Sequence, residues 1–309
     1  MDVGMVGLGR MGSNMARRLL ASGHRVVAYD RRRGRVASLV RQGAAGAKTL
    51  EALVSGLKRP RAVWLMLPAD APTEQTIDAL AGRLDARDLL IDGGNSFYKD
   101  SVRRASRLAS AGIAFVDVGT SGGIWGRERG YCLMVGGEVP AVRRLVPLFR
   151  SLAPAGGVLH VGPSGAGHFV KMVHNGIEYG MLQAYAEGFA LLRGGAYRLK
   201  LDRIARLWNR GSVVRSWLLE LAERALARDP ELRSIAGYVD DSGEGRWMVQ
   251  EAAAFGVPLP SISAALFTRF RSRTEDPFGE KIIAALRREF GGHAARPARR
   301  AAHASSSRR

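Results

Sequence analysis

The run Val3-Gly4-Met5-Val6-Gly7-Leu8-Gly9-Arg10-Met11-Gly12 opens the chain and predicts its fold. A short apolar strand leads into a Gly-x-Gly-x-x-Gly turn, and a helical segment follows to about Ser22. Glycines in such a turn let the backbone approach a pyrophosphate, and the helix N-terminus adds N–H donors and a positive dipole end. We therefore predict that residues 7–12 bind the phosphates of a dinucleotide cofactor, with a purely structural glycine turn as the alternative.

The second predicted strand, residues 25–30, indicates which dinucleotide is bound. It ends in Asp30, whose carboxylate can accept hydrogen bonds from the adenosine ribose hydroxyls and would repel a 2′-phosphate. Arg31 follows directly, with two more arginines after it, and an arginine there can accommodate that phosphate. We predict NAD as the cofactor, with NADP as the alternative.

The first half of the chain alternates between strands and helices. Further strands are predicted at 61–67, 88–92, 113–117, 131–135 and 158–161, and helices from about 71, from 96 to about 111, and over 139–152. This alternation is typical of a doubly wound, mostly parallel sheet, whose ligands bind beyond the carboxyl ends of the strands. The turns 7–12, 93–96 and 120–123 all follow strands, so we expect them to converge on one crevice.

From about Pro163 the pattern is helical to residue 290. Helices are predicted at 163–194, 201–210, 213–228, 244–255, 261–273 and 278–290, and the first of them is expected to be one long helix that joins the two halves. The predicted fold class is therefore α/β: an N-terminal Rossmann domain, 1–162, followed by an all-helical domain, 163–293. Residues 294–309 have little to bury and are predicted to be a disordered basic tail.

One face of the long predicted helix gathers groups that can transfer protons. Lys171, His174, Asn175 and Glu178 lie three, four and seven residues apart, which places them on the same side of a helix. Apolar residues flank this set on both sides. A solvated helix face is the ordinary explanation for mixed charge, but the flanking apolar residues favour an acid–base site.

Composition excludes several classes of protein. The chain has 309 residues, 46% of them hydrophobic, and no apolar run reaches the roughly 18 residues of a membrane span. One cysteine and an N-terminus that enters a strand directly, without a secretion signal, predict a cytoplasmic protein. The net charge of +19 comes mostly from dispersed arginine, and no nucleic-acid-binding or metal-binding pattern accompanies it, so we predict neither nucleic acid nor a metal as partner.

Four features together resemble the β-hydroxyacid dehydrogenase superfamily. They are the helical second half and the motifs Gly7-Leu-Gly-Arg-Met-Gly-Ser-Asn-Met15, Asp117-Val-Gly-Thr-Ser-Gly-Gly123 and Gly165-Ala-Gly-His-Phe-Val-Lys-Met-Val-His-Asn175. Within that superfamily, Ile91-Asp-Gly-Gly-Asn-Ser96 and His174-Asn-Gly-Ile-Glu-Tyr179 are similar to decarboxylating 6-phosphogluconate dehydrogenases. The resemblance covers residues 1–293, and the chain length resembles the short bacterial, NAD-type form.

The resemblance implies roles for individual residues. Lys171 matches the catalytic lysine and Glu178 the catalytic acid. The residues that match ligands of the sugar acid or nicotinamide are Asn95, Ser121, Gly122, Gly123, His174 and Asn175. Tyr179 and Arg269 match ligands of the substrate phosphate. Arg246 replaces the lysine of a Gly-Lys-Trp motif, and a shared site would be completed by Arg287 and His293. The last two lie in a tail motif that one subunit lends to its neighbour, which implies a homodimer or a dimer of dimers.

The implied reaction is oxidative decarboxylation of 6-phosphogluconate to ribulose 5-phosphate and CO2 with reduction of NAD. A 3-hydroxyisobutyrate-type enzyme is the nearest alternative, because it would share Lys171 but would not need the phosphate ligands Arg269, Arg287 and His293. An imine reductase would tend to lack the lysine. A binder that uses the basic tail is the alternative from another class. Ile124-Trp125 stands where the long family form carries acidic residues, which leaves that loop's contacts open.

Overall fold

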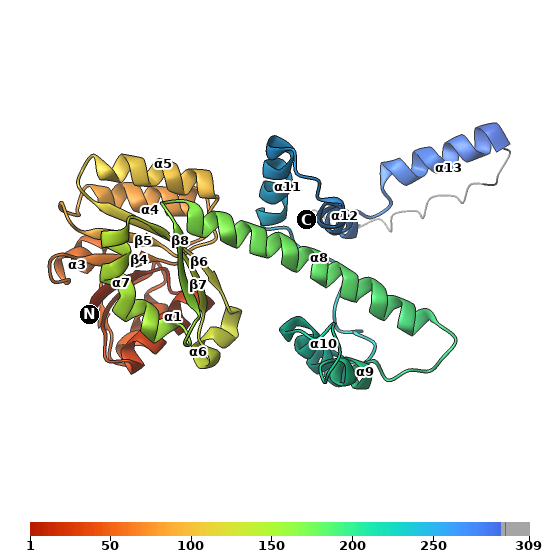
Figure 1. Cartoon of the computed structure of the whole chain (residues 1–309), viewed down its shortest axis with the longest axis horizontal. Coiled ribbons are helices and arrows are strands. Elements are labelled where there is room, and N and C mark those ends of the chain that lie inside the picture. The colour runs from red at the N-terminus through yellow and green to blue at the C-terminus, as the bar shows by residue number, and fades with distance from the viewer. Residues whose placement is uncertain (292–293, 295–309) are drawn as a thin grey trace, which may run out of the picture. The chain divides into compact units, whose positions relative to one another are not determined.

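The computed structural model describes residues 1–291 and residue 294, and its first half is built on an eight-stranded sheet (Figure 1). The strands are β1 (Asp2–Val6), β2 (Arg25–Tyr29), β3 (Ala45–Gly46), β4 (Ala62–Leu65), β5 (Leu89–Asp92), β6 (Ala114–Ser121), β7 (Cys132–Gly137) and β8 (Val158–Gly162). Their order across the sheet is β3-β2-β1-β4-β5-β6-β7-β8. The chain therefore starts mid-sheet, runs to one edge, and returns to build the other, so the strand order reverses between β1 and β4.

All strand pairs are parallel except β6 with β7, which is antiparallel. Only a short segment joins those two strands, made of η1 (Gly123–Trp125) and α6 (Gly126–Arg129). A parallel crossover needs a dozen or more residues, so this connection returns the chain in the opposite direction. The predicted doubly wound, mostly parallel sheet is confirmed.

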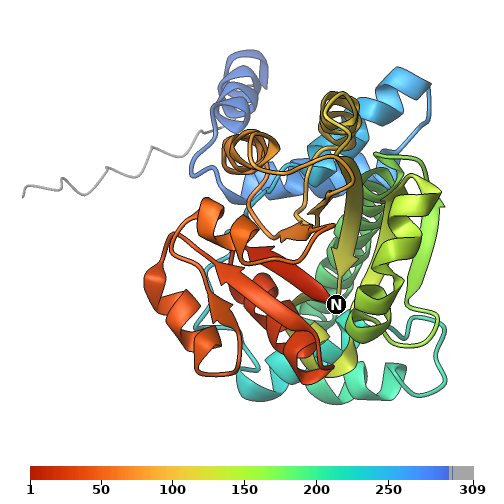
Figure 2. The ribbon, with the colours of Figure 1, turned by 90° about the vertical axis from the view of Figure 1, so that its left-hand side faces the viewer.

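Helices cover both faces of the sheet (Figure 2). On one face lie α1 (Arg10–Ala21), α2 (Arg33–Val40) and α7 (Val139–Leu152), and on the other α3 (Leu50–Ser55), α4 (Ala71–Ala81) and α5 (Tyr98–Ala109). Leu89 and Ile91 of β5 point into the first layer and Leu90 into the second. Both faces of each central strand are thus buried, which is why these strands appear in the sequence as continuous apolar runs.

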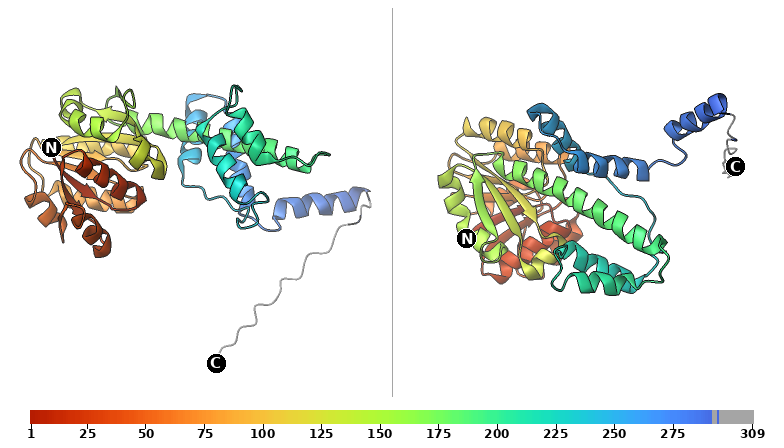
Figure 3. Two further views of the ribbon diagram at one scale, coloured as in Figure 1. Left: turned by 90° about the horizontal axis from the view of Figure 1, so that it is seen from below. Right: turned by 45° about the vertical axis from the view of Figure 1, so that its right-hand side comes forward.

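The long helix expected at 163–194 is present as α8 (Ala166–Gly194), a single helix of 29 residues (Figure 3). It contacts β6, β7, β8 and α5. The helices that follow are α9 (Leu201–Trp208), α10 (Trp217–Arg228), α11 (Glu244–Phe255), α12 (Pro260–Ser272) and α13 (Phe278–Gly291). The predicted all-helical second half is confirmed.

Contacts divide the chain into two compact units. The first holds residues 1–196 and 242–263, so that it contains the sheet, α8 and α11, and the second holds residues 197–241 and the chain from 264 on. The division into domains 1–162 and 163–293 stays a prediction. The two compact units have other boundaries. Of the predicted disordered tail, 295–309 lie outside the described residues.

The sequence patterns missed three elements between Asp30 and Arg61, namely α2, β3 and α3, all of eight residues or fewer. The predicted turn at 120–123 is partly strand, because β6 runs on through Ser121 to pair with β7. Among residues 1–291, no helix combines the length and the apolar character that crossing a membrane requires.

Candidate active site

The glycine turn after β1 has the geometry of an anion-binding loop. Gly7 has a φ of +89°, and a Cβ on Gly12 would overlap the carbonyl oxygen of Gly7, so helix α1 starts tightly against the strand. A Cβ on Gly9 would meet nothing within 4 Å, and the first turn of α1 carries no acidic residue and no side-chain cap. The turn therefore leaves space and N–H donors together, which fits the pyrophosphate of a dinucleotide.

Asp30 lies directly after β2 and is tied to this turn. Its carboxylate accepts the N–H of Leu8 at 2.7 Å and that of Arg32 at 2.7 Å, and Arg35 lies at 3.3 Å. Partial burial alone would raise the pKa of Asp30, but these backbone N–H groups and the Arg35 guanidinium lower it below its usual value. A charged acceptor thus stands where a ribose hydroxyl would be bound, and Arg31 beside it is exposed.

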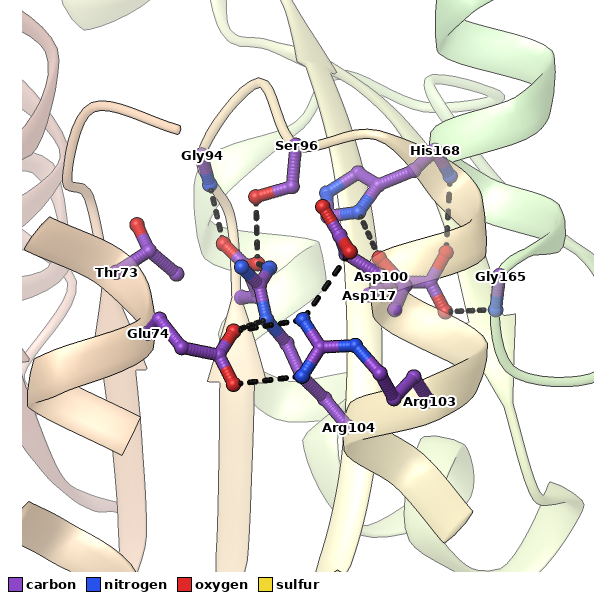
Figure 4. Close-up of polar contacts among 12 residues, drawn as sticks. Thr73, Glu74, Gly94, Ser96, Asp100, Arg103, Arg104, Asp117, Gly165 and His168 are labelled. Atoms are coloured by element: carbon purple, nitrogen blue, oxygen red, sulfur yellow. Dashed lines mark hydrogen bonds and ion pairs between the residues drawn. The ribbon is translucent and has the colours of Figure 1, made fainter. Parts of the chain in front are cut away.

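Two sets of contacts fix the start of α8 on the sheet. The Asp117 carboxylate, fully buried in β6, accepts the N–H groups of Gly165 at 2.6 Å and His168 at 2.8 Å (Figure 4). Gly119 lies under the next turn of α8, where a Cβ would overlap that of Lys171. The helix backbone therefore rests directly on the strand, and the position of Lys171 is fixed by the sheet.

Five predicted site residues meet around the lysine amine. Lys171 Nζ lies 2.7 Å from Asn175 Oδ1 and 3.4 Å from His174 Nδ1. Asn175 Nδ2 donates to Asn95 Oδ1 at 3.2 Å, and Ser121 Oγ lies 3.3 Å from His174 Nε2. Side chains that follow β5 and end β6 therefore lie against the polar face of α8. The nucleotide turn reaches the same edge of the sheet, because Asn14 in α1 donates to the carbonyl of Ile124 at 3.2 Å.

Burial sets the protonation of this cluster. Lys171 is 9% exposed, and this burial lowers the pKa of its amine, while the negative charges of Glu178 and Glu244 partly oppose the shift. Burial also lowers the pKa of His174, and the charge of Lys171 lowers it further. Both shifts favour the neutral forms of the amine and the imidazole, and a neutral amine is a base that can take a proton.

Glu178 stands at the wetter end of the same helix face. Its carboxylate lies 4.0 Å from His174 Nδ1, and its side chain is 42% exposed. Tyr179, one residue on, is buried. The predicted spacing thus places an amine, an imidazole, an amide and a carboxylate along one side of α8.

The other predicted ligands lie on several elements of the two compact units. Gly122 and Gly123 both have positive φ and form the turn that follows β6. Arg246 is exposed on α11 in the first compact unit, whereas Arg269 on α12 and Arg287 on α13 belong to the second. His293, named as a site residue from the resemblance, lies outside the described residues.

Comparison with known proteins identifies the family. A family model described as the NAD binding domain of 6-phosphogluconate dehydrogenase matches residues 2–162, and one described as the 6-phosphogluconate dehydrogenase C-terminal domain matches residues 167–295. The chain belongs to the 6-phosphogluconate dehydrogenase family. The resemblance carried by its motifs is thereby confirmed.

Relatives within the 6-phosphogluconate dehydrogenase family include short and long forms. An NAD(+)-dependent, decarboxylating 6-phosphogluconate dehydrogenase of Haloferax volcanii is 44% identical over 95% of this chain and 98% of its own length. The Plasmodium falciparum 6-phosphogluconate dehydrogenase, solved in apo form and with NADP+ or 6-phosphogluconate, is 29% identical with a TM-score of 0.81. That match covers 94% of this chain but 65% of the Plasmodium chain.

A 3-hydroxyisobutyrate dehydrogenase of Mycobacterium tuberculosis shares the fold of this 6-phosphogluconate dehydrogenase family member. The two are 22% identical with a TM-score of 0.70, and the match covers 93% of this chain and 99% of the other. At that identity the likeness extends to the fold alone.

In this member of the 6-phosphogluconate dehydrogenase family, three buried carboxylates lie beside the site. The sequence patterns did not identify them as functional residues. Asp92 ends β5, Asp117 lies within β6, and Glu244 begins α11, where Ser242 Oγ donates to it at 2.7 Å. The strand-ending position of Asp92 was visible in the sequence, as was the closeness of Glu244 to the Gly245-Arg246-Trp247 motif. Neither signal indicates burial, which depends on the elements that pack around each carboxylate.

Proposed function

We propose that this chain catalyses the oxidative decarboxylation of 6-phospho-D-gluconate to D-ribulose 5-phosphate and CO2, with NAD as the preferred oxidant. The observation that carries the proposal is the buried amine of Lys171, 2.7 Å from the amide oxygen of Asn175, in a member of this family. Burial that lowers the pKa of an amine is what a lysine base needs, because the free side chain has a pKa of about 10.4.

The chain's own residues would hold the dinucleotide at the edge of the sheet. The turn 7–12 would bind its pyrophosphate, Asp30 its adenosine ribose, and Asn95 the nicotinamide end. NAD, when bound, supplies the acceptor for the hydride that leaves C3 of the substrate. Arg31 is the residue that would favour NADP, and the ionised Asp30 carboxylate beside it supports NAD.

Proton transfer is assigned to Lys171 in the first step. Its neutral amine takes the proton of the C3 hydroxyl as the hydride leaves C3, which makes a 3-keto acid and an ammonium. Asn175 Oδ1 and His174 Nδ1 lie next to the amine, at 2.7 and 3.4 Å. Ser121, bonded to His174, and the turn of Gly122 and Gly123 would bind the sugar acid.

The second step releases CO2 from C1. The electrons of the C1–C2 bond move toward the C3 oxygen, where the ammonium of Lys171 stabilises the developing negative charge. Glu178 then donates a proton to the carbon that lost CO2, which completes ribulose 5-phosphate. Its 42% exposed carboxylate supports this role, because it can be reprotonated from solvent.

We also propose that the substrate phosphate is bound by Tyr179, Arg246 and Arg269, with Arg287 and His293 lent by a second copy in a homodimer. Support comes from α13, which has an apolar side but no buried residue within its described part. Its exposed apolar side chains are Phe278, Ile282, Ile283 and Leu286. A cytoplasmic location is part of the same proposal and rests on the single free cysteine.

The direct test measures NADH and NADPH formation with 6-phosphogluconate as sole substrate, with CO2 release followed in parallel. NAD reduction matched by CO2 is expected. NADP reduction matched by CO2, at the higher rate, would retain the chemistry and overturn the assignment of Asp30. Turnover of 3-hydroxyisobutyrate without turnover of 6-phosphogluconate would overturn the proposed substrate.

Replacing Glu244 with glutamine should shift the acidic limb of the kcat/KM profile to lower pH. That limb reports deprotonation of the essential base in the free enzyme. The Glu244 charge raises the pKa of Lys171 against the larger effect of burial, so its removal lowers the pKa further and frees the amine at lower pH. Glu251→Gln is the matched control, because Glu251 is equally buried on α11 but is bonded to Tyr98 and Lys99. An unmoved limb in Glu244→Gln would contradict the expectation.

A further inference from the structure

A single buried carboxylate holds the loop that carries Asn95. Asp92, at the end of β5, accepts the N–H of Gly94 through Oδ1 at 3.0 Å and the hydroxyl of Ser96 through Oδ2 at 2.8 Å (Figure 4). These two contacts grip the loop immediately before and immediately after Asn95. Asp92 is fully buried and Ser96 is 4% exposed, so neither has access to water as an alternative partner.

Arg104 in turn fixes the carboxylate. Its guanidinium donates to Asp92 Oδ2 at 3.1 Å and to Glu74 Oε2 at 2.9 Å, and its side chain is 1% exposed. Hydrogen bonds from Arg103 and then Arg104 lower the pKa of Glu74 to about 2, so that carboxylate stays charged. Asp92 therefore has one orientation, set by a guanidinium that is itself anchored to α4 through Glu74.

The loop is linked to Lys171 through two side-chain amides. Asn95 Oδ1 accepts from Asn175 Nδ2 at 3.2 Å, and Asn175 Oδ1 faces the Lys171 amine at 2.7 Å. An amide can turn over and exchange its oxygen for its nitrogen, and a partner on one side decides which end faces the other. With Asn95 in place, the amide of Asn175 presents an acceptor to the amine. Without it, the orientation of the amide depends on the weaker contact of His174 Nδ1, which lies 3.3 Å from the same oxygen.

We propose that Asp92, Ser96 and Arg104 are positioning residues for the reaction: they hold Asn95 so that Asn175 keeps its carbonyl oxygen on Lys171. The inference rests on the proposed function, because it assigns the three residues to the lysine's chemistry. Asp92 and Arg104 are too buried to touch a substrate, so they act only through the loop.

The same contacts have a purely structural interpretation, in which Arg104 and Glu74 only fasten α4 and α5 together. The two interpretations differ in one measurable respect. If the contacts are only structural, weakening any of them lowers stability. If they position Asn95, weakening them lowers kcat, and it does so only through Asn95. The variant must therefore loosen the loop and leave the buried ion pair intact.

Ser96→Ala meets that requirement, since it removes the hydroxyl on Asp92 and retains Arg104. We expect kcat with 6-phosphogluconate and NAD to fall about 10-fold, since a displacement of 1 Å can cost about 10²-fold and the loop shifts by less. The KM for NAD should rise as well, because Asn95 is also assigned to the nicotinamide end. Ser101→Ala is the matched control: Ser101 is equally buried on α5, but its hydroxyl lies 2.7 Å from His168 Nδ1 and has no contact with the loop. Its kcat should match the wild type.

A double-mutant cycle of Ser96→Ala with Asn95→Ala tests whether Ser96 acts through Asn95. If Ser96 acts through Asn95, Ser96→Ala has no further effect on kcat once Asn95 is alanine. Three results would overturn the proposal: an unchanged kcat in Ser96→Ala, multiplied losses in the double variant, or an equal loss in Ser101→Ala. The wild-type rate with 6-phosphogluconate is read separately and tests the proposed function. If the wild type turns over 3-hydroxyisobutyrate instead, the cycle is run on that substrate.

Discussion

Replacing Lys171 with methionine is expected to lower kcat for 6-phosphogluconate by at least ~10³-fold while NAD still binds. The substitution keeps the length of the side chain and removes the amine. The loss is large because the same nitrogen has two proposed tasks, as base toward the C3 hydroxyl and as ammonium beside the enolate oxygen. The nucleotide turn at 7–12 and Asp30 do not contact Lys171 in any described hydrogen bond, so NAD affinity, measured by calorimetry, should stay within a few-fold of wild type.

Lys48→Met provides the control for this loss, because Lys48 is an exposed lysine in the bend before α3 and has no described side-chain contact. It should retain the wild-type rate. A Lys171→Met enzyme that works within about tenfold of wild type would refute the role of the lysine as base. Loss of NAD binding together with turnover would point instead to a general collapse of the fold.

Replacing Arg104 with methionine is expected to destabilise the protein by about 3–5 kcal/mol. The methionine fills part of the same space but leaves Asp92, fully buried, without its cation. An uncompensated charge in the interior costs far more than the ion pair itself contributes. For a unit of this size, at roughly 2–4 °C per kcal/mol, the melting temperature should fall by about 10 °C in a thermal scan.

Arg103→Met tests whether the loss of stability in Arg104→Met comes from the buried charge of Asp92 or from the loss of an arginine beside Glu74. Arg103 pairs with the same Glu74 and also with Asp100, but its side chain is 51% exposed. Exposed pairs contribute about 0–1 kcal/mol, so its melting temperature should change by only a few degrees. Equal losses in the two variants would mean that Glu74, and not buried Asp92, is the group that depends on arginine.

Much of the site could be predicted because it follows from periodicity and topology. Spacings of three, four and seven residues place Lys171, His174, Asn175 and Glu178 on one side of α8 whatever the rest of the fold does. Asn95 follows a parallel strand and Ser121 ends one, and parallel strands end at one edge of a sheet. Asn95 and Ser121 therefore met the helix as expected.

The supporting carboxylates could not be predicted in the same way. Arg104 and Asp92 are only twelve residues apart, but their pairing requires that α5 return across the end of β5, and Glu74 joins them from α4, thirty residues before Arg104. Nothing local in the sequence distinguishes this buried aspartate from any other that ends a strand. The short elements α2, β3 and α3 were missed for a related reason, since few residues leave little periodicity to detect.

The close packing of α8 on the sheet has a consequence for how this enzyme can vary. Lys171 can lie this close to β6 because Gly119 has no side chain. The preceding turn of α8 also requires a glycine, since a Cβ on Gly167 would overlap the carbonyl oxygen of Met134. Two hydrogen atoms in place of two methyl groups thus determine the height of the base above the sheet. Evolution or design can exchange the side chains that recognise a substrate. Within this scaffold, however, the positions that tolerate least change are these two glycines, which have no side chain to react.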